Sequence, residues 1–219
     1  MEAGLFPCHD RAMSFDIDRF VAACRAARDE PDAPERIAAL VREAIADPAA
    51  ISRAIAQRRN GEREGEMAEL FANAPDLTTY QVSLPSRLFG VPHDHAGWAV
   101  IGVYAGAEAF TIYEERDGKL EPVGRRVMEA GSVDVLPPEL IHDINNPGEA
   151  ASGALHVYAN GHFDWLGRRI WRDGADTAEP FTMARAFEYG MERNARRRHE
   201  LGLGAVEAPL MPDTSRLRC

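Results

Sequence analysis

The segment Pro92-His93-Asp94-His95-Ala96-Gly97-Trp98 places two histidines two positions apart and leads directly into an apolar run at residues 99–104. An extended chain sends alternate side chains to the same face, so both imidazoles are expected to project toward one spot. Two imidazoles on one strand supply two nitrogen ligands for a metal ion. A pair with this spacing also occurs in purely structural roles, so the interpretation depends on a third ligand elsewhere in the chain.

Length, composition and charge limit the classes of protein to which the chain can belong. Of its 219 residues, 45% are hydrophobic and 27% are charged, as in ordinary globular proteins with one core. No apolar run approaches the ~20 residues needed to cross a membrane, and the N-terminus lacks the basic and apolar parts of a signal peptide. The formal net charge of -10 disfavours nucleic acid or an anionic membrane as a partner.

The cysteines indicate a reducing compartment. Cys8, Cys24 and Cys219 are odd in number and widely spaced in the sequence. This usage argues against a framework of disulfides, so we expect a cytoplasmic location. None of the three is close in sequence to the histidine pair, and we assign them no chemistry.

Hydrophobic periodicity divides the chain into helical and strand-forming parts. Apolar residues recur at helical spacing in three segments before residue 60 and in one segment near the C-terminus. From residue 76 onward, short apolar runs separated by glycine and proline are typical of a sandwich or barrel. The expected helices cover residues 14–24, 35–46, 48–59 and 182–201, and the expected strands cover residues 77–84, 98–104, 109–114, 120–127, 131–136 and 151–158.

We therefore expect a mostly β fold that forms one compact domain. Its parts are an N-terminal helical segment (residues 1–72), a barrel (residues 73–175), and a C-terminal helix with a tail (residues 176–219). The N-terminal helices are expected to pack on the barrel rather than to bind a partner. The basic run at residues 193–199 is expected to be a solvated helix end that complements the helix dipole.

A third histidine, His142, follows a strand at a spacing that completes the pair. The pattern G-x5-P-x4-H-x3-N over residues 131–146 opens a strand with glycine, stops it with proline and places His142 in the next segment. This pattern resembles the second motif of the cupin superfamily, and G-x2-H-x-H-x10-G over residues 90–106 resembles the first. The resemblance covers about residues 76–160. It implies a double-stranded β-helix with a metal ion inside the barrel, held by His93, His95 and His142.

One difference from many cupins concerns the metal ligands. Those proteins carry a glutamate four residues after the second histidine, where this chain has Ala99. Three histidines without a carboxylate resemble the cysteine dioxygenase-like branch of the superfamily, which includes mercaptopropionate dioxygenase. The resemblance implies an enzyme with Fe(II) as cofactor that oxidises a thiol sulfur to a sulfinate with O2. Imidazole also suits other metals, so Zn or Ni in the purified protein stays open.

A further motif of this branch lies on a later strand. The branch carries Ser-x-His-x-Tyr, and this chain carries Ala154-Leu155-His156-Val157-Tyr158. His156 and Tyr158 are expected to share one strand face, and the resemblance implies that they form a hydrogen-bonded catalytic pair beside the substrate. The alternative is a pair in the barrel core that contacts only itself. Because Ala154 replaces the serine, the outer hydrogen bond of the pair is missing from the motif.

The residues expected to bind substrate also depart from the pattern. Cysteine dioxygenase anchors the substrate carboxylate with an arginine on an early strand, and the corresponding residues 79–83 contain none. Arg87, Arg168 or the neighbouring Arg169 can supply a guanidinium, which matches a carboxylate best, and Tyr80 is a further candidate for substrate binding. A thiol carboxylate such as 3-mercaptopropionate or mercaptosuccinate is therefore favoured over cysteine.

Two other functions are compatible with the same residues. Zn or Ni held by three histidines can activate water or polarise a substrate, as in a hydrolase or isomerase. Cupin barrels also serve as non-catalytic modules that bind small molecules. For the leading interpretation the expected partners are a small thiol and O2. A homodimer is compatible as well, because exposed strand edges in such barrels are often covered by a partner chain.

Overall fold

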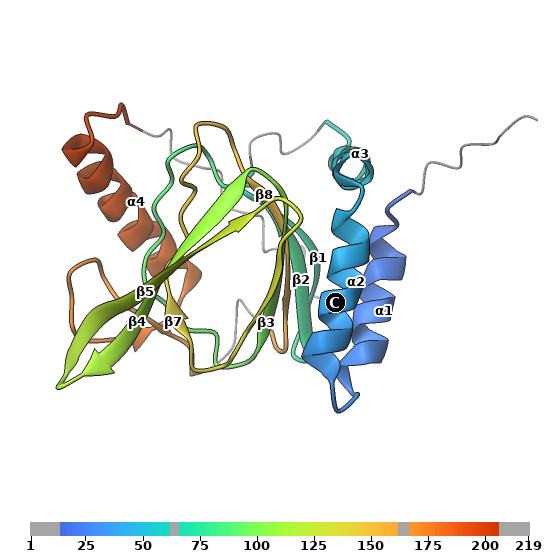
Figure 1. Cartoon of the computed structure of the whole chain (residues 1–219), viewed down its shortest axis with the longest axis horizontal. Helices are drawn as coiled ribbons and strands as arrows, with labels where there is room; N and C mark the ends of the chain where they lie inside the picture. Colours follow the sequence, from blue (N-terminus) through green and yellow to red (C-terminus); the bar gives the residue numbers. More distant parts are fainter. Residues whose placement is uncertain (1–13, 62–65, 162–166, 206–219) are drawn as a thin grey trace, which may run out of the picture.

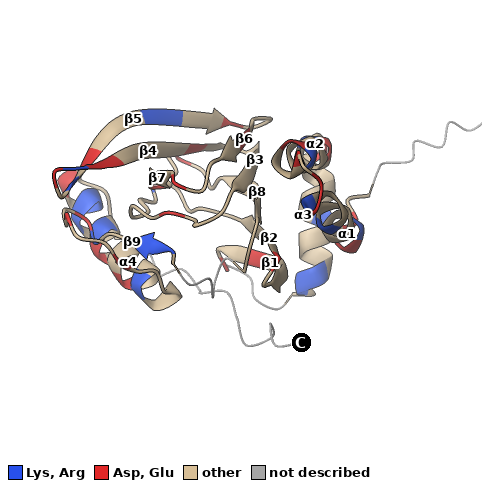
Figure 2. Cartoon of the chain, turned by 90° about the horizontal axis from the view of Figure 1, so that it is seen from below, with Lys and Arg blue, Asp and Glu red and all other residues tan. Residues whose placement is uncertain are grey.

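A computed structural model describes residues 14–61, 66–161 and 167–205 of the protein. Two antiparallel sheets face each other and form the barrel, three helices cover the outer face of one sheet, and a fourth helix lies at the opposite side of the molecule (Figure 1 and Figure 2). None of the helices in these ranges has the length and apolarity required to span a bilayer. Two of the three cysteines, Cys8 and Cys219, lie outside the described residues.

The barrel strands are β1 (Ala68–Ala74), β2 (Leu77–Val82), β3 (Ala99–Ala105), β4 (Ala107–Arg116), β5 (Lys119–Glu129), β6 (Val133–Leu136), β7 (Ile141–His142) and β8 (Gly153–Tyr158). One sheet has the order β1-β2-β8-β3-β6 and the other has the order β5-β4-β7. Isolated bridges from His93 to His142 and from Phe89 to Asn145 extend the second sheet. With the segment at residues 89–93 counted in the second sheet, the chain from β2 onward alternates between the two sheets except at the β4–β5 hairpin, which is the arrangement of a jelly-roll barrel. The predicted cupin double-stranded β-helix is confirmed.

Three helices form a layer on the outer face of the larger sheet: α1 (Ile17–Arg28), α2 (Ala33–Ile45) and α3 (Pro48–Arg59). The side chains of Asp16 and Asp47 cap α1 and α3 by accepting a backbone N–H three residues further on. Helix α2 approaches β3 so closely that a Cβ on Gly102 would lie 2.3 Å from Cγ1 of Val41. Only a glycine permits this approach without movement of the helix. The three helices share a hydrophobic core with this sheet.

Strand β3 is buried on both faces, which explains its unbroken apolar sequence. Val100 and Tyr104 belong to the core shared with the helices, whereas Ile101 and Val103 belong to the core inside the barrel. A sheet that is covered by helices on one face and by a second sheet on the other has no solvated face. The histidine segment that precedes β3 therefore enters the interior of the protein.

The remaining elements are β9 (Arg169–Ile170), β10 (Glu179–Pro180) and α4 (Met183–Glu200), which is N-capped by Thr182. The basic run at residues 193–199 is solvated only in part, because Arg193 and Asn194 are each only 5% exposed. Arg193 pairs with a buried aspartate of the barrel, and Asn194 bonds to the backbone of Phe89. These contacts attach α4 to the barrel.

Four of the strands were not expected from the sequence. Strand β1 begins at Ala68, ahead of the boundary at residue 73 that the sequence pattern suggested, so the barrel starts earlier. Strands β7, β9 and β10 have 2 residues each. A strand of that length carries no periodicity, because the side-chain period is itself two residues.

Candidate metal centre

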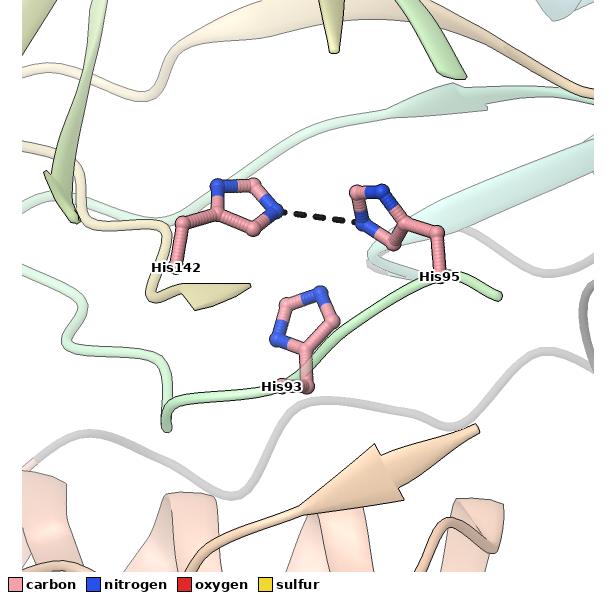
Figure 3. A group of neighbouring side chains, drawn as sticks. All are labelled: His93, His95 and His142. Carbon is pink, nitrogen blue, oxygen red and sulfur yellow. Dashed lines mark hydrogen bonds between the residues drawn. The ribbon is translucent and has the colours of Figure 1, made fainter. Parts of the chain in front are cut away.

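Three histidines from two segments of the chain meet inside the barrel (Figure 3). His93 and His95 lie between β2 and β3, and His142 ends β7. Each offers one ring nitrogen, and the three nitrogens lie within 4.8 Å of one another. His95 and His142 are each 1% exposed. The structure brings together all three predicted ligands, and no carboxylate or thiol from the described residues joins the group.

Backbone hydrogen bonds fix the two ligand segments against each other. The N–H of His93 donates to the carbonyl of His142 at 2.9 Å, and the N–H of His142 donates to the carbonyl of His93 at 3.0 Å. Asp94, between the first two ligands, is held by Arg169, whose backbone N–H and Nε each donate to its carboxylate at 2.7 Å. The two sequence motifs thus lie side by side as paired strand segments.

The imidazoles are in a setting that favours their neutral form. His93 Nδ1 lies 3.0 Å from the carbonyl oxygen of Val91. Since a carbonyl only accepts, Nδ1 carries the proton and Nε2 keeps the lone pair that a metal needs. Burial lowers the pKa of His93 to about 4. Burial, and then the charge of the neighbouring His93, lowers the pKa of His142 well below its ordinary value.

The spacing of the ligand nitrogens fits a metal ion. His142 Nε2 and His95 Nε2 are 3.1 Å apart. Two nitrogens that share one ion at about 2.0–2.1 Å stand about 3.1 Å apart when the angle between them at the ion is about 95°. Three neutral imidazoles suit Fe, Zn, Cu or Ni. They leave the other coordination positions to water or a substrate.

Tyr158 faces the histidines and belongs to a hydrogen-bonded chain of side chains. It pairs with Ala99 across β3 and β8, and its ring centroid lies 5.1 Å from that of His95. Its hydroxyl lies 2.9 Å from His156 Nδ1 and 3.1 Å from the hydroxyl of Tyr80. Burial raises the pKa of Tyr158 well above its ordinary value and that of Tyr80 to about 12. Both phenols therefore keep their protons at neutral pH.

Glu108 on β4 was not predicted as part of the site. It is fully buried, and its Oε2 lies 3.7 Å from His156 Nε2. The sequence held a weak signal for it, because period-2 spacing places Glu108 on the same strand face as Phe110. The ring of Phe110 contacts that of His142 with 4.9 Å between centroids. A charged residue beside a core aromatic at strand spacing is the pattern that could have identified it.

The arginines proposed as substrate anchors have different surroundings. Arg168 is 2% exposed, its Nε donates to the backbone carbonyl of Asp94 at 3.1 Å, and its guanidinium stacks on Phe181. Burial lowers its pKa to about 10, so it remains charged at neutral pH. The side chain of Arg87 is 40% exposed and pairs with Glu149, so it lies away from the histidines. Arg169 is engaged with two carboxylates.

A cavity of about 230 Å³ adjoins the metal centre. Most of its wall is apolar and includes residues of both sheets and of α4. The polar side chains that line it include His93, His142, His156, Tyr80, Tyr158 and Arg168. Two of the three predicted ligands, the predicted catalytic pair and two of the four candidate substrate-binding residues thus share one cavity.

Solved structures of cupin and double-stranded β-helix proteins are similar to part of this chain. The sequence matches no family model. A cupin superfamily protein from Desulfitobacterium hafniense shares 13% identity over 42% of this chain and 75% of that chain, with a TM-score of 0.36. A cupin 2 conserved barrel domain protein from Salinispora arenicola shares 21% identity over 42% and 77%, with a TM-score of 0.34. A protein with a double-stranded β-helix domain from Klebsiella pneumoniae shares 18% identity over 49% and 85%, with a TM-score of 0.36. The cupin fold of this chain rests on its strand order and histidine motifs, and similarities of this size carry no information about activity.

Proposed function

We propose that the protein is an Fe(II)-dependent thiol dioxygenase that acts on a small thiol carboxylate, such as 3-mercaptopropionate, mercaptosuccinate or cysteine. In this reaction both atoms of one O2 are added to the thiol sulfur. The sulfur loses four electrons, O2 gains four, and the product is a sulfinate. Iron held by His93, His95 and His142 would supply the site at which thiolate and O2 react.

One observation carries this proposal: two members of the three-histidine group, His93 and His142, line one small cavity together with a protonated phenol and a charged guanidinium. A donor set without a carboxylate leaves the positive charge of a metal ion to be balanced by an anionic ligand such as a thiolate. Most of the cavity wall is apolar, and an apolar setting strengthens each electrostatic contact inside it.

The side chains around the ligands have separate tasks in this scheme. Arg168 binds the substrate carboxylate through charge-assisted hydrogen bonds. Tyr158 keeps its proton, and it lines the cavity in which the substrate would bind. His156 and Tyr80 hold the Tyr158 hydroxyl from two sides, at 2.9 Å and 3.1 Å.

The test is anaerobic loading with Fe(II), followed by measurement of oxygen uptake and sulfinate formation with a panel of small thiols. We expect one O2 to be consumed for each sulfinate formed. His142→Ala is expected to lose bound iron and oxygen uptake, whereas the matched control His199→Ala, at an exposed position on α4, keeps both. Stoichiometric iron without oxygen uptake for any thiol would refute the proposal. Tightly bound zinc and no redox response would favour a hydrolase or isomerase instead.

A further inference from the structure

We infer that the substrate is a thiol carboxylate that carries a hydrocarbon branch, such as a 2-mercaptoalkanoate. This inference rests on the proposed function and narrows its substrate class. It is carried by the separation of polar and apolar groups within the cavity.

The polar groups that would bind the substrate lie close together at one end of the cavity. The Cζ of Arg168 is 3.7 Å from the ring centroid of Phe181, and that centroid is 6.1 Å from the ring centroid of His93. A thiol at the metal and a carboxylate at Arg168 are therefore near neighbours on one molecule.

Much of the remaining cavity wall is formed by one face of α4. Its lining residues are spaced three and four apart, which places them on the same side of a helix. They are Met183, Ala186, Phe187, Gly190, Met191 and Asn194, and five of these six are apolar. Leu84, Leu88 and Ile144 of the barrel line the same cavity. A substrate fixed at the polar end therefore has an apolar space beside it.

The size and chemistry of that space select a carbon chain. A volume of about 230 Å³ holds roughly eight groups of the size of a water molecule, which suits a 2-mercaptoalkanoate of about six carbons. Each methylene that leaves water for an apolar wall raises affinity about fourfold. An unbranched small thiol would forgo this gain and leave water against apolar side chains.

The experiment measures binding of mercaptoacetate, 2-mercaptobutanoate and 2-mercaptohexanoate by calorimetry under argon, with the protein loaded with Zn(II). We expect Kd to fall about fourfold for each added methylene. A Kd that is constant or rises along the series would overturn the inference. Neither iron nor O2 is present in this binding experiment, so its result does not depend on whether the protein oxidises thiols. A failure of this inference can therefore be distinguished from a failure of the proposed function.

Gly190 provides a variant that tests the location of the branch. A Cβ at this position would meet no atom within 4 Å, so Gly190→Leu extends into the apolar end without a clash, and Gly190→Ala is the matched control. We expect Gly190→Leu to weaken binding of 2-mercaptohexanoate by about tenfold or more and to leave mercaptoacetate within about twofold. An equal loss for both ligands would overturn the assignment. If Gly190→Leu does not fold, the chain-length series alone decides.

A second, independent observation concerns Glu108. We propose that Glu108 is a positioning residue that fixes the tautomer of His156. Its Oε2 lies 3.7 Å from His156 Nε2, and neither carboxyl oxygen has a hydrogen-bond partner within the described part of the chain. Leaving a buried carboxyl group without a hydrogen bond is costly. His156 Nε2, which also has no hydrogen-bond partner in the described part of the chain, lies within ion-pair distance, so a proton on Nε2 would be directed at the carboxylate.

This arrangement sets the direction of the hydrogen bonds around Tyr158. With Nε2–H directed at Glu108, Nδ1 of His156 holds the lone pair that accepts the hydroxyl of Tyr158. The oxygen of Tyr158 in turn accepts the hydroxyl of Tyr80. Glu108 on β4 thus replaces the outer serine that is missing at Ala154.

Long-range 1H–15N NMR of the zinc-loaded protein reads the tautomer from the nitrogen shifts of His156. We expect the Nε2–H form in the wild type. It should persist in Glu108→Gln, whose amide oxygen still accepts, and be lost in Glu108→Leu. The exposed His199 is the internal control and should not change. An Nδ1–H form in the wild type, or an unchanged spectrum in Glu108→Leu, would overturn this proposal.

Discussion

Replacing Arg193 with alanine is expected to destabilise the fold far more than replacing a solvent-exposed arginine of the same basic run. Arg193 Nη2 donates to Asp143 Oδ2 at 2.6 Å, and the two side chains are 5% and 0% exposed. Asp143 also accepts the backbone N–H of Thr111 at 2.9 Å and the hydroxyl of Tyr113 at 2.7 Å. This ion pair therefore joins α4 to β4 and to the residue that follows His142.

The magnitude follows from the charge that the substitution leaves behind. Removing one partner of a buried ion pair costs about 3–5 kcal/mol, because the other charge stays buried. Neutral donors still bond Asp143, so we expect the lower end, about 3 kcal/mol of unfolding free energy. In a chain of this length, that loss lowers Tm by about 6–12 °C. The double variant Asp143→Asn/Arg193→Met leaves neither charge, and most of the loss should disappear.

Urea unfolding followed by circular dichroism measures these free energies. Arg196→Ala is the matched control on the same helix, since Arg196 is 50% exposed and forms an ion pair with Asp173. Such surface pairs contribute about 0–1 kcal/mol. The reasoning is refuted if Arg193→Ala loses less than about 1 kcal/mol, or if the double variant is no more stable than Arg193→Ala.

Three other changes test the site and the packing around it. Burial lowers the pKa of His93 to about 4, so the histidine of the unfolded metal-free chain takes up a proton at a higher pH than that of the folded chain. The free energy of unfolding should therefore drop by about 3 kcal/mol as pH falls from about 6.5 to about 4. An equal drop in His93→Gln would contradict this origin. Burial raises the pKa of Cys24 to about 12, so mass spectrometry should find it unmodified by iodoacetamide until urea unfolds the protein. Gly102→Ala should cost about 1–3 kcal/mol of unfolding free energy by displacing α2, while Gly124→Ala, whose nearest neighbours are 3.9 Å away, should cost almost nothing.

The barrel and the three-histidine group were predictable because their signals are local. The apolar run of β3 and the alternation in neighbouring strands give the architecture within a few residues of the observed bounds. The β4–β5 hairpin turns at Asp117 and Gly118, whose φ angles are 51° and 75°, as an Asp-Gly turn requires. His93, His95 and His142 lie in short motifs at fixed spacing, so their meeting followed from the motifs.

The residues that escaped prediction depend on pairing across the fold. Arg193 and Asp143 are 50 positions apart, and the basic run around Arg193 looks like a solvated helix face. Glu108 contacts His156 from a strand of the opposite sheet. Arg87 and Arg168 could not be separated in the sequence, because burial alone distinguishes them. Periodicity shows which face of an element is apolar, but not which distant group lies against it.

The side chain of Asn194 makes with Phe89 the hydrogen bonds that a neighbouring β-strand would make. The N–H of Phe89 donates to its Oδ1 at 2.9 Å, and its Nδ2 donates to the carbonyl of Phe89 at 2.6 Å. A primary amide offers the same donor and acceptor as a peptide group, so one helical residue occupies the backbone edge at which another chain could pair. The same two hydrogen bonds therefore attach α4 to the barrel and protect this strand edge. Detaching the helix would simultaneously uncover the apolar wall and expose an unpaired backbone to aggregation.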